Sequence, residues 1–145
     1  MLGLLYSANE GLICGRRFAG SDTTAIASRS VFYYLITNPL TYRRLVSEID
    51  LAFTDGQPSD PVAYAETLKL PYPCACTKEA TRLHPSITFT LPRITPEGGD
   101  HIVGRFTPAG YRVGINPAVV HYDKGVFGED ANEFNPSRSC IGTRP

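Results

Sequence analysis

The chain has 145 residues, of which 42% are hydrophobic and 19% charged, a composition typical of a globular domain rather than of a disordered segment. Its 14 basic and 14 acidic residues give a net charge of zero, so we expect no nucleic-acid partner. The longest apolar run, Val31 to Ile36, is far shorter than the roughly 20 residues that cross a bilayer, so we expect no membrane span in this chain.

The sequence contains four cysteines, Cys14, Cys74, Cys76 and Cys140. No secretory signal precedes them, and the C-x-C spacing of Cys74 and Cys76 does not suit a zinc knuckle. We therefore expect four reduced and separate thiols.

The first third of the chain is predicted to be helical. A proline-free stretch from about Gly11 to Thr37 predicts a long helix that Asn38-Pro39 ends, because proline disfavours helical geometry in the residue before it. Arg16-Arg17 would place unpaired charges on a buried helix at a cost of several kcal/mol, so we expect the opening residues to depart from that helix. A second helix is predicted from Pro39 to about Phe53, with one apolar face made by Tyr42, Leu45, Val46, Ile49 and Phe53.

The middle of the chain is predicted to hold two further helices. The composition of Asp55 to Pro61 is that of a loop, and Val62 to Leu68 could form a short helix. Another helix is expected to begin near Pro71 to Pro73 and to end before His84-Pro85.

The second half is predicted to contain the strands. Ile87 to Leu91 suits a short buried strand, and Glu97 to Asp100 suits a turn. A two-stranded hairpin is expected from Ile102–Phe106 and Tyr111–Ile115, joined by a tight turn at Thr107-Pro108-Ala109-Gly110. After Asn116-Pro117 the chain is predicted to be irregular, so the fold class is mainly α with a small β part.

The first motif with chemical potential is Ala19-Gly20-Ser21-Asp22-Thr23-Thr24, a set of mediocre helix formers inside the first predicted helix. Small residues let a flat cofactor approach the backbone, and threonine hydroxyls can bond back to a carbonyl and bend the helix. An acid and a hydroxyl at such a bend can relay protons. The alternative is an ordinary N-cap, with Ser21 or Asp22 starting a helix at Thr23.

Two further motifs follow. Glu79 and Arg82 are three residues apart and can pair on one side of a helix, either on the surface or buried with a third partner. Arg138-x-Cys140-x-Gly142 could hold a low-pKa thiolate or a metal ligand, or Cys140 could be a spare thiol in a frayed tail.

With the three motifs in this order and spacing, the chain resembles the cytochrome P450 family from about Gly11 to Gly142. Within the family, the resemblance is to the fungal type. The resemblance implies a partial P450 fold: a long central helix, the helices after it, a short β hairpin and an irregular, meander-like tail. It also implies a single partial domain over residues 1–145, without the family's N-terminal half and final helix. Intact relatives of this type are often anchored to the endoplasmic reticulum, and the location of this chain is left open.

The resemblance also assigns roles to single residues. Thr23 would direct protons to dioxygen, Asp22 would link that relay to solvent, and Ala19 and Gly20 would let the helix lie over a haem. Cys140 would be the axial thiolate ligand of the haem iron, which favours O–O cleavage.

Three arginines receive structural or haem-binding roles from the same resemblance. Glu79 and Arg82 would form a buried ion pair, and Arg93 would bind a haem propionate, which suits its guanidinium. Arg138 matches two sites of the family, because Phe134-x-Pro136-x-Arg138 fits the meander and Arg138-x-Cys140 fits the cysteine loop. It is therefore either the third member of an ion-pair triad with Glu79 and Arg82 or a propionate ligand.

The function implied is haem-dependent oxidation of a small apolar organic substrate by dioxygen, with electrons from a reductase partner. Two alternatives stay open. The chain could be an inactive fragment, such as a mis-spliced or pseudogene product that does not bind haem. It could also be a small helical interaction domain, which the amphipathic helix at Pro39 to Phe53 would serve.

Overall fold

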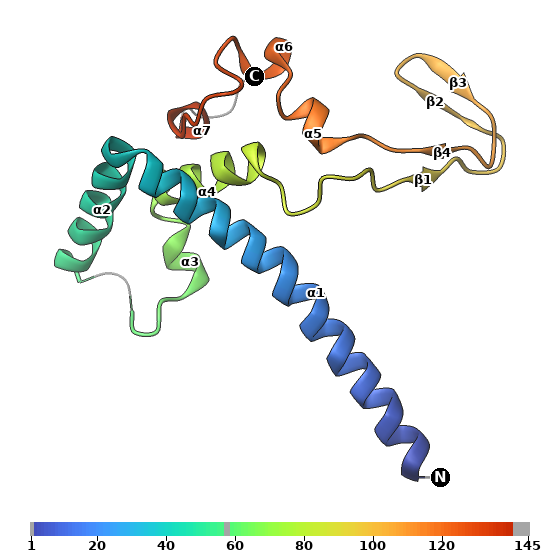
Figure 1. Cartoon of the computed structure of the whole chain (residues 1–145), viewed down its shortest axis with the longest axis horizontal. Helices are drawn as coiled ribbons and strands as arrows, with labels where there is room; N and C mark the ends of the chain where they lie inside the picture. Colours follow the sequence, from blue (N-terminus) through green and yellow to red (C-terminus); the bar gives the residue numbers. More distant parts are fainter. Residues whose placement is uncertain (1, 57–58, 141–145) are drawn as a thin grey trace. The chain divides into compact units, whose positions relative to one another are not determined.

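The computed structural model describes the backbone of residues 2–56 and 59–140, and the side chains of 20–56 and 59–139. It is mainly helical with two short antiparallel strand pairs, so the predicted fold class is confirmed (Figure 1). Contacts group the chain into two compact units, Met1–Ser86 with Asn132–Pro145, and Ile87–Ala131, and each is described here by itself. A single partial domain over the whole length stays a prediction.

Helix α1 spans Leu2–Thr37 and ends where the sequence predicted, before Pro39. The Asn38 side chain helps to end it, since its Nδ2 donates to the Tyr34 carbonyl at 2.8 Å. The helical backbone continues through Arg16-Arg17, so the expected departure from the helix is wrong. The expectation considered only the cost of burying the two charges, whereas arginine has a high helix propensity that favours a continuous helix. Ser21 and Asp22 lie in mid-helix, so the N-cap alternative is also wrong.

Three shorter helices complete the helical part of the first unit. They are α2 at Pro39–Thr54, α3 at Tyr64–Thr67 and α4 at Pro71–Leu83, each close to its predicted bounds. Proline stands in the first turn of α2 and α4, where its missing N–H costs no hydrogen bond. The apolar face predicted for α2 is only partly correct, because Tyr42 and Phe53 are 51% and 58% exposed. No described helix is long and apolar enough to cross a membrane.

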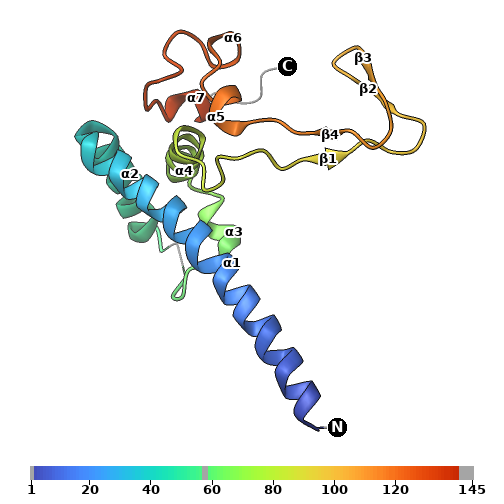
Figure 2. The ribbon, with the colours of Figure 1, turned by 45° about the vertical axis from the view of Figure 1, so that its right-hand side comes forward.

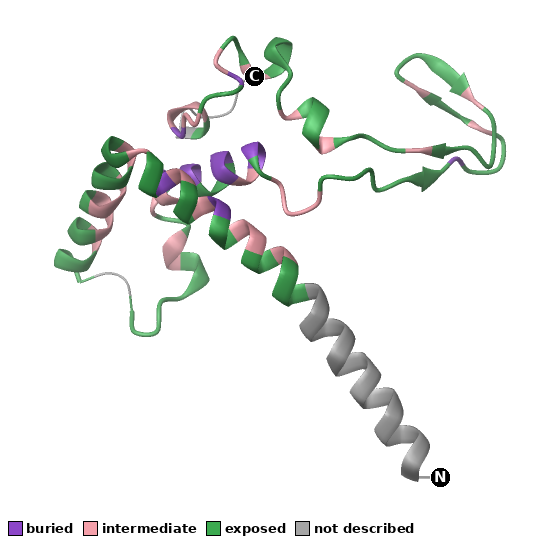
Figure 3. Cartoon of the chain, in the orientation of Figure 1, coloured by how far each residue is buried: buried purple, intermediate pink, exposed green. Residues whose placement is uncertain are grey.

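The core of the first unit lies where α4 packs against the C-terminal half of α1, and both views show this crossing (Figures 1 and 2). Leu35 of α1 joins Tyr72 and Cys76 of α4 in the buried cluster, and Val31, Leu45 and Phe134 pack around it. Figure 3 shows the buried residues concentrated along α4, while α2 has no buried residue. Neither Cys74 nor Cys76, whose side chains are described, forms a disulfide.

The strand pairing in the second unit differs from the prediction. β1 (Arg93–Ile94) pairs with β4 (Arg112–Val113), and β2 (Asp100–Ile102) pairs with β3 (Arg105–Thr107). The turn between β2 and β3 consists of Val103 and Gly104, with φ of 50° and 75°. Positive φ at both residues of a two-residue turn matches the twist of the flanking strands. The predicted turn at Thr107-Pro108-Ala109-Gly110 instead contains the end of β3 and most of its connection to β4, so the predicted hairpin is wrong.

The buried strand predicted at Ile87 to Leu91 is wrong as well. This segment is irregular, and Phe89 and Leu91 are 66% and 52% exposed. Pro85 and Pro92 flank it, and none of the four described strands pairs with it. An extended segment without a neighbour has no partner for its backbone hydrogen bonds.

The last part of the chain is irregular, as predicted, and contains three single-turn helices. α5 (Pro117–Val120) and α6 (Lys124–Phe127) belong to the second unit, and α7 (Ser137–Cys140) belongs to the first. Asn116 and Asp123 cap α5 and α6 by accepting hydrogen bonds from backbone N–H groups two residues later. In the first unit, α7 packs against α4.

Candidate functional site

The most buried polar group in the first unit is the Glu79 carboxylate on α4. Its side chain is 1% exposed and that of Arg82, one helical turn later, is 7% exposed. Arg82 binds it in a bidentate way, with Nε donating to Oε2 at 2.9 Å and Nη2 donating to Oε1 at 2.8 Å. The two residues therefore form a buried ion pair and not the surface pair that the sequence left open.

The segment from Glu133 to Arg138, which runs into α7, supplies further partners of this pair. Arg138 Nε lies 3.4 Å from Glu79 Oε1, and the Asn135 backbone N–H donates to the same oxygen at 3.2 Å. The Glu133 carbonyl accepts from Arg82 Nη2 at 3.3 Å. In the described part of the chain no buried side-chain nitrogen or oxygen lacks a partner, so the cost of burying these charges is offset. We call Glu79, Arg82 and Arg138 the Glu79 cluster.

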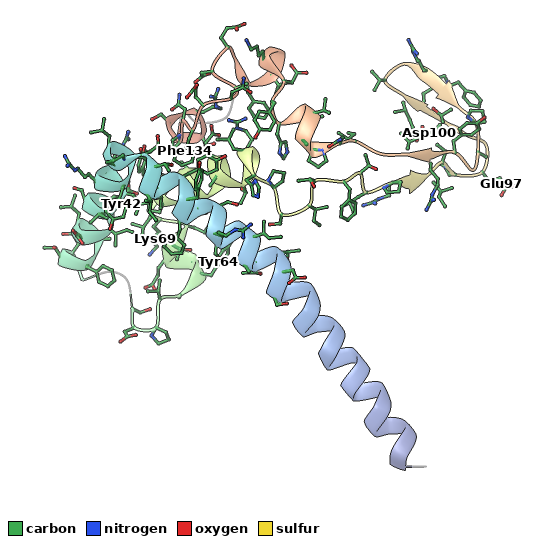
Figure 4. The ribbon with its side chains drawn as sticks, in the orientation of Figure 1. Tyr42, Tyr64, Lys69, Glu97, Asp100 and Phe134 are labelled. Carbon is green, nitrogen blue, oxygen red and sulfur yellow. The ribbon has the colours of Figure 1, made fainter. Side chains whose placement is uncertain are left out.

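Aromatic stacking holds this segment over the helices. Phe134, labelled in Figure 4, stacks on Tyr34 of α1 with ring centroids 4.9 Å apart and planes 16° apart. Pro136, two residues later, is buried. Sequence reasoning missed the contributions of Glu133 and Asn135, because both act through backbone groups that every residue carries.

The first motif lies on α1 and presents two environments. Gly20, Ser21 and Asp22 are exposed, whereas Thr23 is half-buried. A Cβ placed on Gly20 would meet no described heavy atom within 4 Å, so that side of the helix is open. The Thr23 carbonyl accepts a hydrogen bond from Ser86 Oγ at 2.8 Å. α1 shows no sharp kink at the motif in either view, in contrast to the predicted bend (Figures 1 and 2).

The remaining predicted site residues are Arg93, Ala19 and Cys140. Arg93 is exposed in the second unit, and its Nη1 donates to the Leu91 carbonyl at 3.3 Å. The side chains of Ala19 and Cys140 lie outside the described residues, although both stand in helical backbone. The predicted approach of Cys140 to Asp22 and Thr23 thus stays a prediction.

Comparison with known proteins agrees with this arrangement of helices and motifs. The family model described as Cytochrome P450 matches residues 15–139, which include the α1 motif and the Glu79 cluster. The chain belongs to the cytochrome P450 family.

Several fungal P450s are similar in sequence. The chain is 48% identical over 124 residues to cytochrome P450 monooxygenase cicH of Emericella nidulans, and this match covers 86% of the chain and 25% of that protein. It is 44% identical over 124 residues to cytochrome P450 monooxygenase ACRTS1 of Alternaria alternata, with 86% and 33% covered. It is 44% identical over 120 residues to pisatin demethylase of Fusarium vanettenii, with 83% and 23% covered. The chain thus spans a third or less of the length of these relatives.

A solved structure of a zebrafish P450 with progesterone has the same fold. It superposes with a TM-score of 0.72 at 23% identity, covering 88% of this chain and 29% of that one. At this level of identity the likeness supports the fold alone. The predicted partial P450 fold, in its mainly helical form, is confirmed.

Haem is the cofactor of the P450 family, and the described residues fit it in part. The exposed, unobstructed side of α1 at Gly20 suits the approach of a flat ring, and a cysteine thiolate such as that of Cys140 is the axial donor that the family uses. Of the two roles predicted for Arg138, its contact with the buried Glu79 carboxylate favours membership of the Glu79 cluster.

Proposed function

We propose that this chain provides the proton-relay helix and the Glu79 cluster of a haem-dependent monooxygenase, which oxidises a small apolar organic substrate with dioxygen and electrons from a reductase. The observation that carries this proposal is that one continuous P450 match, residues 15–139, contains both the α1 motif and a fully partnered Glu79 cluster. The name of one relative, pisatin demethylase, supports a small organic substrate class.

The residues of the α1 motif and Cys140 would each have a separate role at the haem. Haem, when bound, would supply the redox chemistry, and the Cys140 thiolate would hold its iron. Thr23 is half-buried and would hold a proton in place at its hydroxyl, whereas the exposed Asp22 carboxylate beside it would exchange protons with solvent. Gly20 and Ala19 would leave room for the ring beside α1.

We assign Arg138 to the Glu79 cluster and Arg93 to the haem propionate. The 3.4 Å contact of Arg138 with Glu79 and its 11% exposure support the first assignment. Arg93 lies on an exposed strand, and its guanidinium donates to the backbone carbonyls of Leu91 and Pro92, so it can turn to a carboxylate.

A second candidate is a P450-derived chain that does not carry out catalysis. The position of Arg138 favours it, because one arginine serves the Glu79 cluster here where the family pattern has separate arginines in the meander and in the cysteine loop. Haem binding through Cys140 distinguishes this candidate from the first.

Thr23→Ala should uncouple oxygen consumption from product formation, since positioned proton transfer contributes roughly 100-fold or more to such steps. A suitable system is a chimera in which residues 20–138 replace the matching segment of pisatin demethylase, assayed with pisatin. We expect product per dioxygen consumed to fall by at least about tenfold, with hydrogen peroxide released instead. Thr24→Ala, at the adjacent exposed position, is the control and should keep its coupling. Equal coupling in the Thr23 and Thr24 variants would argue against the relay.

A further inference from the structure

In the part of α1 whose side chains are described, the first residue that is not exposed is the motif threonine, Thr23. Thr23, Ile26, Ala27 and Ser30 are the residues in this part of α1 that are at least half-buried, and their spacing of three and four places them along one side of the helix. Thr23 and Ser30 are seven residues apart, which is about two turns. Thr23 thus stands at the border between the packed side of α1 and its open side.

Two serine hydroxyls connect this face to the segment that follows α4. Ser30 Oγ, on α1, lies 3.5 Å from the His84 carbonyl and also donates to the Ile26 carbonyl at 2.8 Å. Ser86 Oγ donates in the opposite direction, to the Thr23 carbonyl, at 2.8 Å. The Ser86 bond is the short one, and it joins residues that are 63 positions apart in the sequence.

The segment that carries Ser86 has little freedom to adjust. α4 ends at Leu83, and Pro85 fixes one backbone dihedral between His84 and Ser86. His84 is tied to the last turn of α4 by its N–H, which donates to the Ala80 carbonyl at 2.9 Å. Because seven residues of α4 are buried, this helix forms a rigid base for the Ser86 hydroxyl.

A hydrogen bond to the Thr23 carbonyl determines more than the position of that oxygen. A carbonyl has two lone pairs, so it can accept from Ser86 while it serves the helix ladder. Holding the carbonyl fixes the peptide plane after Thr23 and hence the direction of its Cα–Cβ bond. In a helix threonine divides mainly between two χ1 rotamers, so the orientation of the backbone limits the directions in which its hydroxyl can point.

We propose that Ser86 is a positioning residue that aims the Thr23 hydroxyl by holding the Thr23 carbonyl. This role rests on the relay assigned to Thr23 under the proposed function, but the hydrogen bond and its effect on Thr23 do not depend on haem. Ser86→Ala removes the donor, Ser86→Thr keeps a hydroxyl, and Thr88→Ala removes an exposed hydroxyl two residues later as a control.

The first measurement is amide hydrogen exchange on the full chain, compared between peptides that cover 20–30 and peptides that cover α2. In Ser86→Ala we expect exchange of the amides near Thr23 to be about fivefold faster, which corresponds to the loss of one hydrogen bond of ordinary net strength. Exchange in α2 should be unchanged. Ser86→Thr should restore the original rate near Thr23, and Thr88→Ala should leave it as it was.

The second measurement is the NMR methyl signal of Thr23 in ¹³C-threonine-labelled chain, with Thr37, at the far end of α1, as the internal reference. We expect the Thr23 signal to move in Ser86→Ala, to return in Ser86→Thr, and the Thr37 signal to stay in place. The proposal is overturned if exchange near Thr23 is unchanged in Ser86→Ala or if exchange in α2 accelerates equally. It is also overturned if the Thr23 methyl signal does not move in Ser86→Ala. A chain that fails to bind haem in a separate assay would contradict the proposed function and leave these results standing.

Discussion

Replacing Glu79 with alanine is expected to lower the free energy of unfolding by about 3–5 kcal/mol, the usual cost of removing one partner from a buried ion pair. Glu79 is 1% exposed and lies against Arg82 and Arg138, which are 7% and 11% exposed. Without the carboxylate, two guanidinium groups would face each other in a largely dry environment. The Asn135 N–H would also lose its acceptor.

Lys124→Ala is the matched control for this prediction. Lys124 Nζ and Glu129 Oε2 are 2.8 Å apart, the same distance as Arg82 Nη2 and Glu79 Oε1, but their side chains are 55% and 89% exposed. An exposed pair contributes no more than about 1 kcal/mol, so this variant should unfold almost as the original chain does. Urea unfolding followed by circular dichroism measures both variants. Similar losses in the two would show that burial does not decide the strength of the Glu79 cluster.

Leu35→Ala is expected to cost about 2–5 kcal/mol, because it leaves a cavity where α1 packs on α4. Leu35 is 7% exposed and contacts the cluster that contains Tyr72 and Cys76, the latter fully buried. The loss should appear as a lower urea midpoint with an unchanged slope, since the packing weakens but the surface exposed on unfolding stays about the same.

The neighbouring residue provides the control for Leu35. Ile36 is 74% exposed, so Ile36→Ala removes an aliphatic side chain from the same helix without opening a cavity. Because alanine is the better helix former, this variant should match the original chain or be slightly more stable. If Ile36→Ala were as destabilised as Leu35→Ala, the packing of α1 on α4 described above would be incorrect.

The helices could be predicted from the sequence because their ends carry local signals. Pro39, Pro71 and Pro85 each mark a helix boundary within a residue or two, and this signal acts on the neighbouring backbone alone. The strands could not be predicted in the same way. Pairing of β1 with β4 joins segments on either side of the β2–β3 hairpin, and nothing in two-residue strands specifies such a partner.

The sequence predicted which residues form the Glu79 cluster but not all of the contacts that they make. The i, i+3 spacing predicted that Glu79 and Arg82 pair, but burial and the arrival of Glu133 and Asn135 depend on tertiary packing. The sequence left Arg138 between two sites, and its contact with Glu79 was needed to choose. Ser86 carried no signal at all, since a lone serine after a proline is common in loops.

The central claim is that Cys140 ligates haem in this chain, and the reduced, carbon-monoxide-bound spectrum of the haem-reconstituted chain tests it most directly. The account predicts a thiolate-type Soret band that is lost in Cys140→Ser and kept in Cys74→Ser. Cys74 is the control because it lies in the first turn of α4, where its thiol donates to the Thr67 carbonyl at 3.3 Å. A thiolate-type band that survives Cys140→Ser, or a chain that takes up no haem, would contradict it.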